Sequence, residues 1–195
     1  MFNFQADPFD NFSFLLNNAT EKKIAEPNAM SLATIGLDGK PSVRIVYFKG
    51  MVRGGFSFYC NYESEKGRSL AKNHEVCVNF YWPELWQQVR ISGVVEKLSR
   101  SESEAYFATR PRISQIGAWA SNQSQEIDSY DVFGKAVESF TQKFEGQEVP
   151  CPPHWGGYRI EPQRFEFWFG LTGRLHERYV YTKTEDGWAR SMLAP

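Results

Sequence analysis

The sequence is poor in the residues that cross-link small proteins or bind metals. Three cysteines, an odd number without a CxxC spacing, and three scattered histidines occur among 195 residues. These counts argue against a disulfide framework and against a zinc site, so we expect no metal. No apolar run approaches the roughly 18 residues of a membrane span, and the opening residues MFNFQADPFDNF lack a basic region followed by an apolar stretch. We therefore expect no membrane partner and a cytoplasmic location.

The sequence also lacks an excess of charge of either sign. Lysine and arginine total 22 and aspartate and glutamate total 23, which gives a net charge of -1. Without a basic field the chain is not expected to bind nucleic acid, and any anion site must be local. The glycine signatures GxGxxG and GxxxxGK are absent as well. Their absence disfavours a nucleotide-binding fold of alternating strands and helices.

Aromatic residues are abundant, at 16% of the chain. Such a content suits packed sheets, interfaces and planar ligands. The length, together with a hydrophobic content of 42%, predicts one folded domain over residues 1–195.

Local patterns predict a few helices between many strands. Asp7-Pro8 and Ser64 each resemble a helix start, Ser101 with Glu104 resembles a capping box ahead of a helix that Pro111 ends, and residues 127–144 have helical periodicity. Strand character is expected in residues 29–35, 41–48, 56–60, 75–82, 85–98, 156–170, 174–184 and 188–193. This order predicts a mainly β fold with flanking helices, as an antiparallel barrel or sandwich.

The segment RLHER carries a concentrated group of polar side chains. Arg174, His176 and Arg178 recur at every second position, so on a strand all three project from one face. That face would present two cations and a titratable imidazole. A solvated strand face has the same spacing, and the spacing does not choose between the two interpretations.

Three more cations have a rationale as anion ligands. Lys66 lies near the start of the helix that follows Ser64, where free N–H groups and the helix dipole favour a phosphate. Arg44 and Lys49 are five residues apart, on opposite faces of a regular strand unless Gly50 bends its end. A helix-surface lysine and charges that protect a strand edge are the alternatives.

Hydroxyl and amide groups complete the set of candidates. Tyr106 and Arg110 share one helix face and Ser114 follows the proline break, so the three suit a phosphate pocket. Packing of Tyr106 and a helix-dipole role of Arg110 fit the same spacing. Gln88 and the turn Gln123-Ser124 offer further polar groups, which mean little by themselves.

Taken together, these segments resemble the pyridoxine (pyridoxamine) 5′-phosphate oxidase family. The resemblance runs over nearly the whole chain, through RIVYFK, FYCNYESEKG, YFATRPRISQIGAWASNQS, VPCPPHWGGYR, EFWFG and RLHER. It implies a split antiparallel β-barrel with flanking helices, an obligate homodimer, and FMN held between the subunits.

The resemblance also implies roles for individual residues. Contacts to the FMN phosphate and ribityl chain fall on Arg44, Tyr59, Cys60, Lys66, Gln123 and Ser124. Contacts to the isoalloxazine ring fall on Lys49, Gln88, Trp168 and Arg178. Contacts to the substrate phosphate fall on Lys49, Tyr106, Arg110 and Ser114. The catalytic pair beside the pyridine ring corresponds to Arg174 and His176.

The implied activity is a pyridoxal 5′-phosphate synthase. Such an enzyme oxidises pyridoxamine 5′-phosphate and pyridoxine 5′-phosphate with molecular oxygen and releases hydrogen peroxide. One alternative is a flavin oxidase of the phenazine-pathway type, which would not need the phosphate ligands Tyr106, Arg110 and Ser114. The other is a module that binds FMN or pyridoxal phosphate without catalysis.

The chain departs from the family pattern at two places. The family usually has an arginine immediately before the lysine that matches Lys66, and this chain has Glu65. We expect Glu65 to turn toward solvent, because Arg44, Lys66 and the helix start already supply donors. The basic, tyrosine-containing segment that precedes Ala6-Asp7-Pro8 in typical members is not in this sequence. We expect less complete closure over the substrate.

Overall fold

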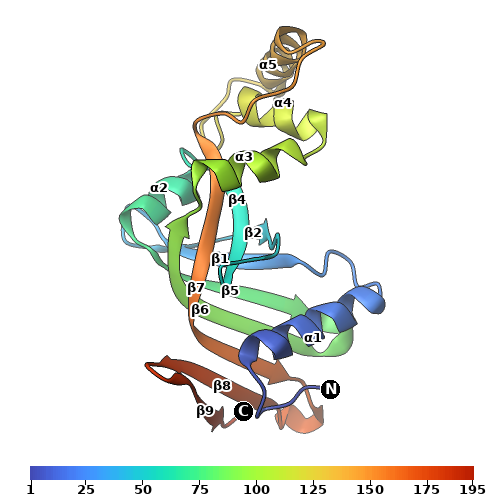
Figure 1. The fold of residues 1–195 in the computed structure, drawn as a ribbon, viewed down its shortest axis with the longest axis vertical. Helices are drawn as coiled ribbons and strands as arrows, with labels where there is room; N and C mark the ends of the chain where they lie inside the picture. Colours follow the sequence, from blue (N-terminus) through green and yellow to red (C-terminus); the bar gives the residue numbers. More distant parts are fainter.

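The computed structural model describes residues 1–195 as one antiparallel sheet with helices packed around it (Figure 1). The strands are β1 (Ala29–Ile35), β2 (Pro41–Tyr47), β3 (Met51–Val52), β4 (Gly55–Asn61), β5 (Glu75–Trp82), β6 (Gln87–Lys97), β7 (Trp155–Phe169), β8 (Glu177–Thr184) and β9 (Gly187–Leu193). The helices are α1 (Pro8–Glu21), α2 (Glu65–Lys72), α3 (Arg100–Ala108), α4 (Arg112–Ala120) and α5 (Tyr130–Lys143), with 3-10 turns η1 (Pro83–Leu85) and η2 (Thr172–Arg174). The sheet order is β2-β1-β5-β6-β7-β4-β3, and β8 pairs with both β7 and β9. The predicted mainly β architecture with flanking helices is confirmed.

Strand β7 changes partner halfway along one of its edges, and this change divides the sheet. Its first half pairs with β4 and its second half, from Arg164, pairs with β8, while β6 follows its other edge. Pro162 lies between the two halves, where a residue without an N–H costs no sheet hydrogen bond on the open edge. Opposite Pro162 the β6 register shifts at Gly93, where a Cβ atom would lie 2.0 Å from the carbonyl oxygen of Glu161. The sheet bends here and forms a split barrel.

An aromatic core fills the concave side of the sheet. Asp7 accepts a hydrogen bond from the Phe9 N–H and begins α1, as predicted. Helix α1 lies across the strands in Figure 1 and buries Phe12 and Leu15 against them. The largest buried side chains around it are Met30, Leu32, Phe56, Phe58, Phe80, Trp82, Phe165, Phe167 and Tyr181. Each such side chain stabilises the fold by about 1.5–3 kcal/mol when it leaves water.

Helix α3 begins two residues earlier than the sequence predicted. The capping box consists of Ser99 and Glu102, and the predicted pair Ser101 and Glu104 lies inside the helix. Both pairs have the same spacing. The buried residue Leu98 donates its N–H to the Gly157 carbonyl at the end of the sheet, so the chain leaves the sheet there and the first serine becomes the cap.

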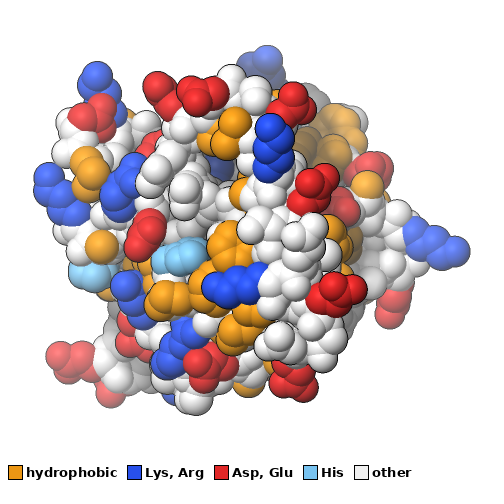
Figure 2. All heavy atoms as spheres, turned by 90° about the horizontal axis from the view of Figure 1, so that it is seen from above, with side chains coloured by type: hydrophobic (Ala, Val, Ile, Leu, Met, Phe, Trp, Pro, Cys, Tyr) orange, Lys and Arg blue, Asp and Glu red, His pale blue; other side chains and the backbone are white.

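Helices α4 and α5 stand beyond one end of the sheet. A second core cluster of Phe107, Ile116, Phe144, Val149 and Trp155 joins them to β7. Figure 2 looks down on this end and shows hydrophobic side chains gathered near its centre, with cationic side chains and a histidine beside them. None of the helices has the length and apolar character needed to cross a lipid bilayer.

Candidate active site

A cavity of about 700 Å³ opens where α3, α4, β4 and the end of β2 meet. Its lining includes eight of the residues selected from the sequence: Lys49, Tyr59, Cys60, Lys66, Tyr106, Arg110, Ser114 and Gln123. Three of these are cations, and no carboxylate lines the cavity. Lys49 lies two residues beyond the end of β2 and lines this wall, and the next residue, Gly50, has a positive φ of 107°. Fixed positive charge without a counter-charge in a confined space suits an anionic ligand.

Arg110 gives the cavity its most specific anion donor. Its guanidinium lies over the Trp155 ring at 4.6 Å from the centroid, and burial lowers its pKa. It stays charged at physiological pH because an arginine pKa starts so high. One terminal nitrogen, Nη1, is buried without a hydrogen-bond partner. A buried cationic N–H without an acceptor is costly, so this nitrogen is suited to a ligand oxygen.

Aromatic rings form the wall beside Arg110. The rings of Tyr59 and Tyr106 stack with centroids 3.8 Å apart, and Tyr59 also stacks on Trp155. The predicted set Tyr106, Arg110 and Ser114 lies in one cavity. The predicted reason is wrong, because α3 ends at Ala108 and Arg110 follows the helix, while Ser114 lies in α4. Trp155 was not among the predicted site residues, although it lies in the segment VPCPPHWGGYR that carries the family resemblance.

Lys66 reaches the cavity from the first turn of α2. Ser64 caps this helix as predicted, accepting from the Gly67 N–H. The Lys66 ammonium donates to Ser64 Oγ at 3.2 Å and to Gln123 Oε1 at 3.0 Å, and burial lowers the lysine pKa. Beside it, burial raises the pKa of the Cys60 thiol to about 11. Cys60 is therefore a neutral wall residue.

Arg44 lies behind this wall and does not line the cavity. Its guanidinium donates to Thr34 Oγ1 at 2.7 Å, to Ser42 Oγ at 2.7 Å and to nearby backbone carbonyls. Glu65 has a 62% exposed side chain, yet its carboxylate lies 3.9 Å from the Arg44 guanidinium and accepts from Ser42 Oγ. Glu65 is therefore exposed to solvent, as expected, but it also contacts Arg44, which was not expected.

A second group of predicted residues lies at the far end of β7. Gln88, Trp168 and Arg178 are cross-strand neighbours on β6, β7 and β8, so they form one row across the sheet. The His176 ring lies beside the Trp168 ring, with centroids 4.7 Å apart. We call these three residues with His176 the strand row.

The prediction that Arg174, His176 and Arg178 project from one strand face is wrong. Strand β8 begins at Glu177, and Arg174 ends the turn η2 in the left-handed region with φ of 62°. His176 accepts the Leu171 N–H on Nδ1 and closes this turn. The alternation that the sequence suggested fails because a tight turn takes the place of the first three residues, 174–176, of the expected strand 174–184. Ser124 likewise occupies a left-handed turn, with φ of 69°, and does not line the cavity beside Gln123.

The cavity and the strand row lie at opposite ends of β7. Trp155 lines the cavity and Trp168 belongs to the row, so about 40 Å of strand separates them at 3.3 Å per residue. The cavity also opens beside an apolar strip of β2, where Val43, Ile45 and Tyr47 are exposed. Exposed apolar side chains next to an open cavity are typical of an interface.

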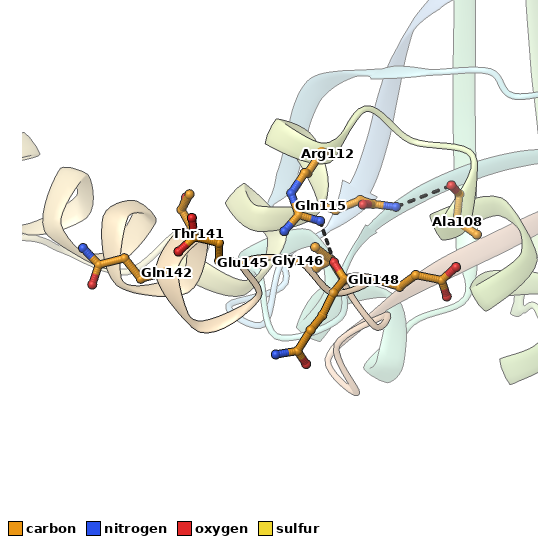
Figure 3. Close-up of a pocket in the computed structure, with 10 residues that line it drawn as sticks. Ala108, Arg112, Gln115, Thr141, Gln142, Glu145, Gly146 and Glu148 are labelled. Atoms are coloured by element: carbon orange, nitrogen blue, oxygen red, sulfur yellow. Dashed lines mark hydrogen bonds between the residues drawn. The ribbon is translucent and has the colours of Figure 1, made fainter.

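Another hollow, of about 770 Å³, lies between α4, the end of α5 and the segment that follows it (Figure 3). It contains none of the predicted site residues. Arg112 donates to the carbonyls of Phe144 and Gln147, and Gln115 donates to the carbonyl of Phe107, so these side chains are already engaged. Glu145 and Glu148 line the hollow, which makes it unsuited to an anion.

Comparison with known proteins assigns the chain to a family. A sequence model described as pyridoxamine 5′-phosphate oxidase matches residues 16–144. A protein of Bdellovibrio bacteriovorus named pyridoxine/pyridoxamine 5′-phosphate oxidase is 54% identical over 196 residues, which cover 100% of both chains. The chain belongs to the pyridoxamine 5′-phosphate oxidase family. A relative of the same name from Burkholderia multivorans is 50% identical and covers 97% of this chain and 89% of its own.

Other matches bear on assembly and fold. A model described as the pyridoxine 5′-phosphate oxidase C-terminal dimerisation region matches residues 155–195, which supports a homodimer. PhzG from Burkholderia lata 383, solved with tetrahydrophenazine-1-carboxylic acid, superimposes with a TM-score of 0.91 at 31% identity over 97% of this chain and 93% of PhzG. An FMN-binding protein of Nostoc punctiforme related to the family has a TM-score of 0.77 at 15% identity, over 97% and 99% of the two chains. These structures share the split-barrel fold, as the sequence predicted.

Proposed function

We propose that this member of the family is an FMN-dependent oxidase that converts pyridoxamine 5′-phosphate and pyridoxine 5′-phosphate to pyridoxal 5′-phosphate. Oxygen is the electron acceptor and hydrogen peroxide the second product. The observation that carries the proposal is the cavity with three cations, no carboxylate and the unpartnered Arg110 nitrogen. Such a site is suited to phosphate, and phosphate is common to both substrates and to FMN.

The residues present fit FMN as a cofactor. Lys66, at the start of α2, and Gln123 offer donors for a phosphate, with Arg44 behind them. The strand row offers an indole, an amide and a guanidinium side by side, which suits a planar heterocycle with polar edges. When bound, FMN supplies the acceptor for the two electrons that leave the substrate.

The remaining predicted residues would hold and orient the substrate. Arg110, with Lys49 and Ser114, binds its phosphate in the cavity. His176 exchanges a proton with the substituent that is oxidised, and Arg174 on the adjacent turn holds the pyridine ring. Arg178 presents positive charge to the ring system of the cofactor, where negative charge develops during the reaction.

This assignment requires two chains at each site. The cavity and the strand row lie at opposite ends of β7, so one flavin contacts both only if the row comes from a second chain. The dimerisation-region match covers Trp168, His176 and Arg178 of the strand row, and the exposed strip of β2 adjoins the cavity. We infer a homodimer with two equivalent sites between its subunits.

The match to PhzG favours a second candidate, an oxidase of the phenazine type. The ligand in the PhzG structure, tetrahydrophenazine-1-carboxylic acid, carries a carboxylate and no phosphate. A ligand of that kind leaves more of the cationic cavity unused. The strong positive charge around Arg110 therefore supports the phosphorylated substrates over this alternative.

The test compares substrates and one variant. We expect the purified protein to be yellow and to release peroxide with pyridoxamine 5′-phosphate, but not with tetrahydrophenazine-1-carboxylic acid. Arg110→Ala removes one charge-assisted bond of about 1.5–3 kcal/mol, which raises the Michaelis constant about ten- to a hundredfold. The amount of FMN bound per subunit should be the same in Arg110→Ala as in wild type. The proposal would be contradicted if the protein oxidised the phenazine compound and not pyridoxamine 5′-phosphate. It would also be contradicted if Arg110→Ala had the same Michaelis constant as wild type for the phosphorylated substrate.

A further inference from the structure

Glu166 is a buried carboxylate on the face of β7 that points away from the aromatic core. Its side chain is 2% exposed. It accepts hydrogen bonds from Arg90 at 3.4 Å, from Arg164 at 3.1 Å and from Arg178 at 3.0 and 2.7 Å. Burial opposes its ionisation, but the bonds from Arg178 and Arg164 outweigh burial and hold its pKa below the usual value. Glu166 is thus a fixed negative charge among three positive ones.

The contact with Arg178 is the most restrictive of the three. Nε and Nη2 of this guanidinium both donate to Glu166 Oε1, and Nη1 donates to the Ala194 carbonyl at 3.1 Å. All three nitrogens are therefore held, and the planar group has one orientation. The backbone of Arg178 pairs with Trp168, so this orientation is set relative to the strand row.

We propose that Glu166 is a positioning residue for the flavin. It fixes the Arg178 guanidinium beside Trp168 and Gln88, and offsets one of the three positive charges at that end of the sheet. This inference rests on the proposed function, because the flavin contact of Arg178 belongs to it. Without Glu166 the guanidinium would lose its paired acceptor, and the polar edge of the flavin would meet a mobile cation.

The test substitutes Glu166→Gln and measures FMN binding to the apoprotein by flavin fluorescence. The amide keeps the shape but turns an NH₂ group or a single neutral oxygen toward Arg178. We expect FMN to bind about tenfold more weakly, the loss of one strong charge-assisted interaction. Glu161→Gln is the matched control. Glu161 is on the same strand, half-exposed and paired with Lys183 and Arg159, and its loss should leave FMN affinity within about twofold of wild type.

A double-mutant cycle separates positioning from a general structural effect. In an Arg178→Gln background, Glu166→Gln should change FMN affinity by less than about twofold, because the group through which it acts is already gone. An equal loss in both backgrounds would overturn the inference. If Glu166→Gln shows no cooperative thermal transition, Glu166→Asp is used in its place. This variant keeps the negative charge but moves it away from Arg178 by the length of one methylene group. We expect Glu166→Asp to weaken FMN binding when Arg178 is present and to have no effect on it in the Arg178→Gln background.

The outcomes also distinguish this inference from the proposed function. Wild-type protein that binds no FMN contradicts the proposed function, and the role of Glu166 toward flavin falls with it. Wild-type protein that binds FMN while Glu166→Gln binds it equally well overturns the positioning role alone.

Discussion

Single side chains in the cavity wall have their protonation states set by burial. The Cys60 thiol is the clearest case, because it lies beside two cations that favour the thiolate. Lys66 and Arg44 lower its pKa, yet burial has the larger opposite effect and the pKa is about 11. A cysteine near lysine and arginine is therefore not a nucleophile here, since the thiolate is the reactive form.

Alkylation with iodoacetamide checks this protonation state. We expect Cys60 to resist labelling in the native protein at pH 8 and to react faster as the pH approaches 11, because a raised pKa keeps the thiol protonated below that value. Peptide mass spectrometry follows the residue. In urea-unfolded protein, which serves as the control, Cys60 should label at pH 8 like an ordinary cysteine. Rapid native labelling at pH 8 would show that the thiol is not held in this state.

At the scale of elements, caps and turns decide where helices and strands begin. Ser99 accepts from the Glu102 N–H, and Glu102 accepts from the Ser99 N–H, so α3 begins at the edge of the sheet. The alternative pair Ser101 and Glu104 has the same sequence spacing. Only the anchoring of Leu98 to β7 distinguishes them.

Two alanine substitutions compare these caps. Ser99→Ala should lower the free energy of unfolding by about 1 kcal/mol, the usual cost of an N-cap. Ser101→Ala, the matched control, should stay within about 0.5 kcal/mol of wild type. Urea unfolding at one fixed protein concentration measures both. Equal losses would mean that the cap is shared between the two serines.

The same reasoning explains which parts of the fold and site were predictable. Helix starts at Asp7 and Ser64 depend on neighbouring residues, so local sequence was sufficient. Tyr106, Arg110 and Ser114 do line one cavity, but the predicted shared helix face of Tyr106 and Arg110 does not exist, because α3 ends at Ala108. The positions of the strand-row residues and of Glu166 relative to one another depend on the register of β6, β7 and β8. That register is set by contacts between residues far apart in sequence, so local sequence does not reveal it. No local pattern marks the left-handed Arg174, so the expected strand 174–184 was wrong at residues 174–176 and correct from Glu177 onward.

At the scale of the whole molecule, the cavity and the strand row lie at opposite ends of β7, so mixing subunits of two variants tests whether each site is built from two chains. Arg110→Ala disables the cavity and Arg178→Gln disables the strand row. A hybrid dimer of the two variants has one site with both defects and one site with neither. Random assembly of equal amounts makes half of the dimers hybrid, so about a quarter of wild-type activity should return.

The assay is peroxide release at a substrate concentration below the Michaelis constant, after joint refolding of the two variants. Each variant refolded alone is the control. A mixture that shows only the mean of the two parents would place each site within a single chain.

The partner change of β7 also has a kinetic consequence. Its first half pairs with β4, where Phe56 meets Ile160. Bringing together strands roughly 100 residues apart costs about 4 kcal/mol of chain entropy before any contact offsets it. Refolding should therefore be slow, because non-local pairing limits the rate in such topologies. Until β7 arrives, β4 exposes Phe56 and Phe58 along an open edge, so aggregation will compete most strongly at that stage.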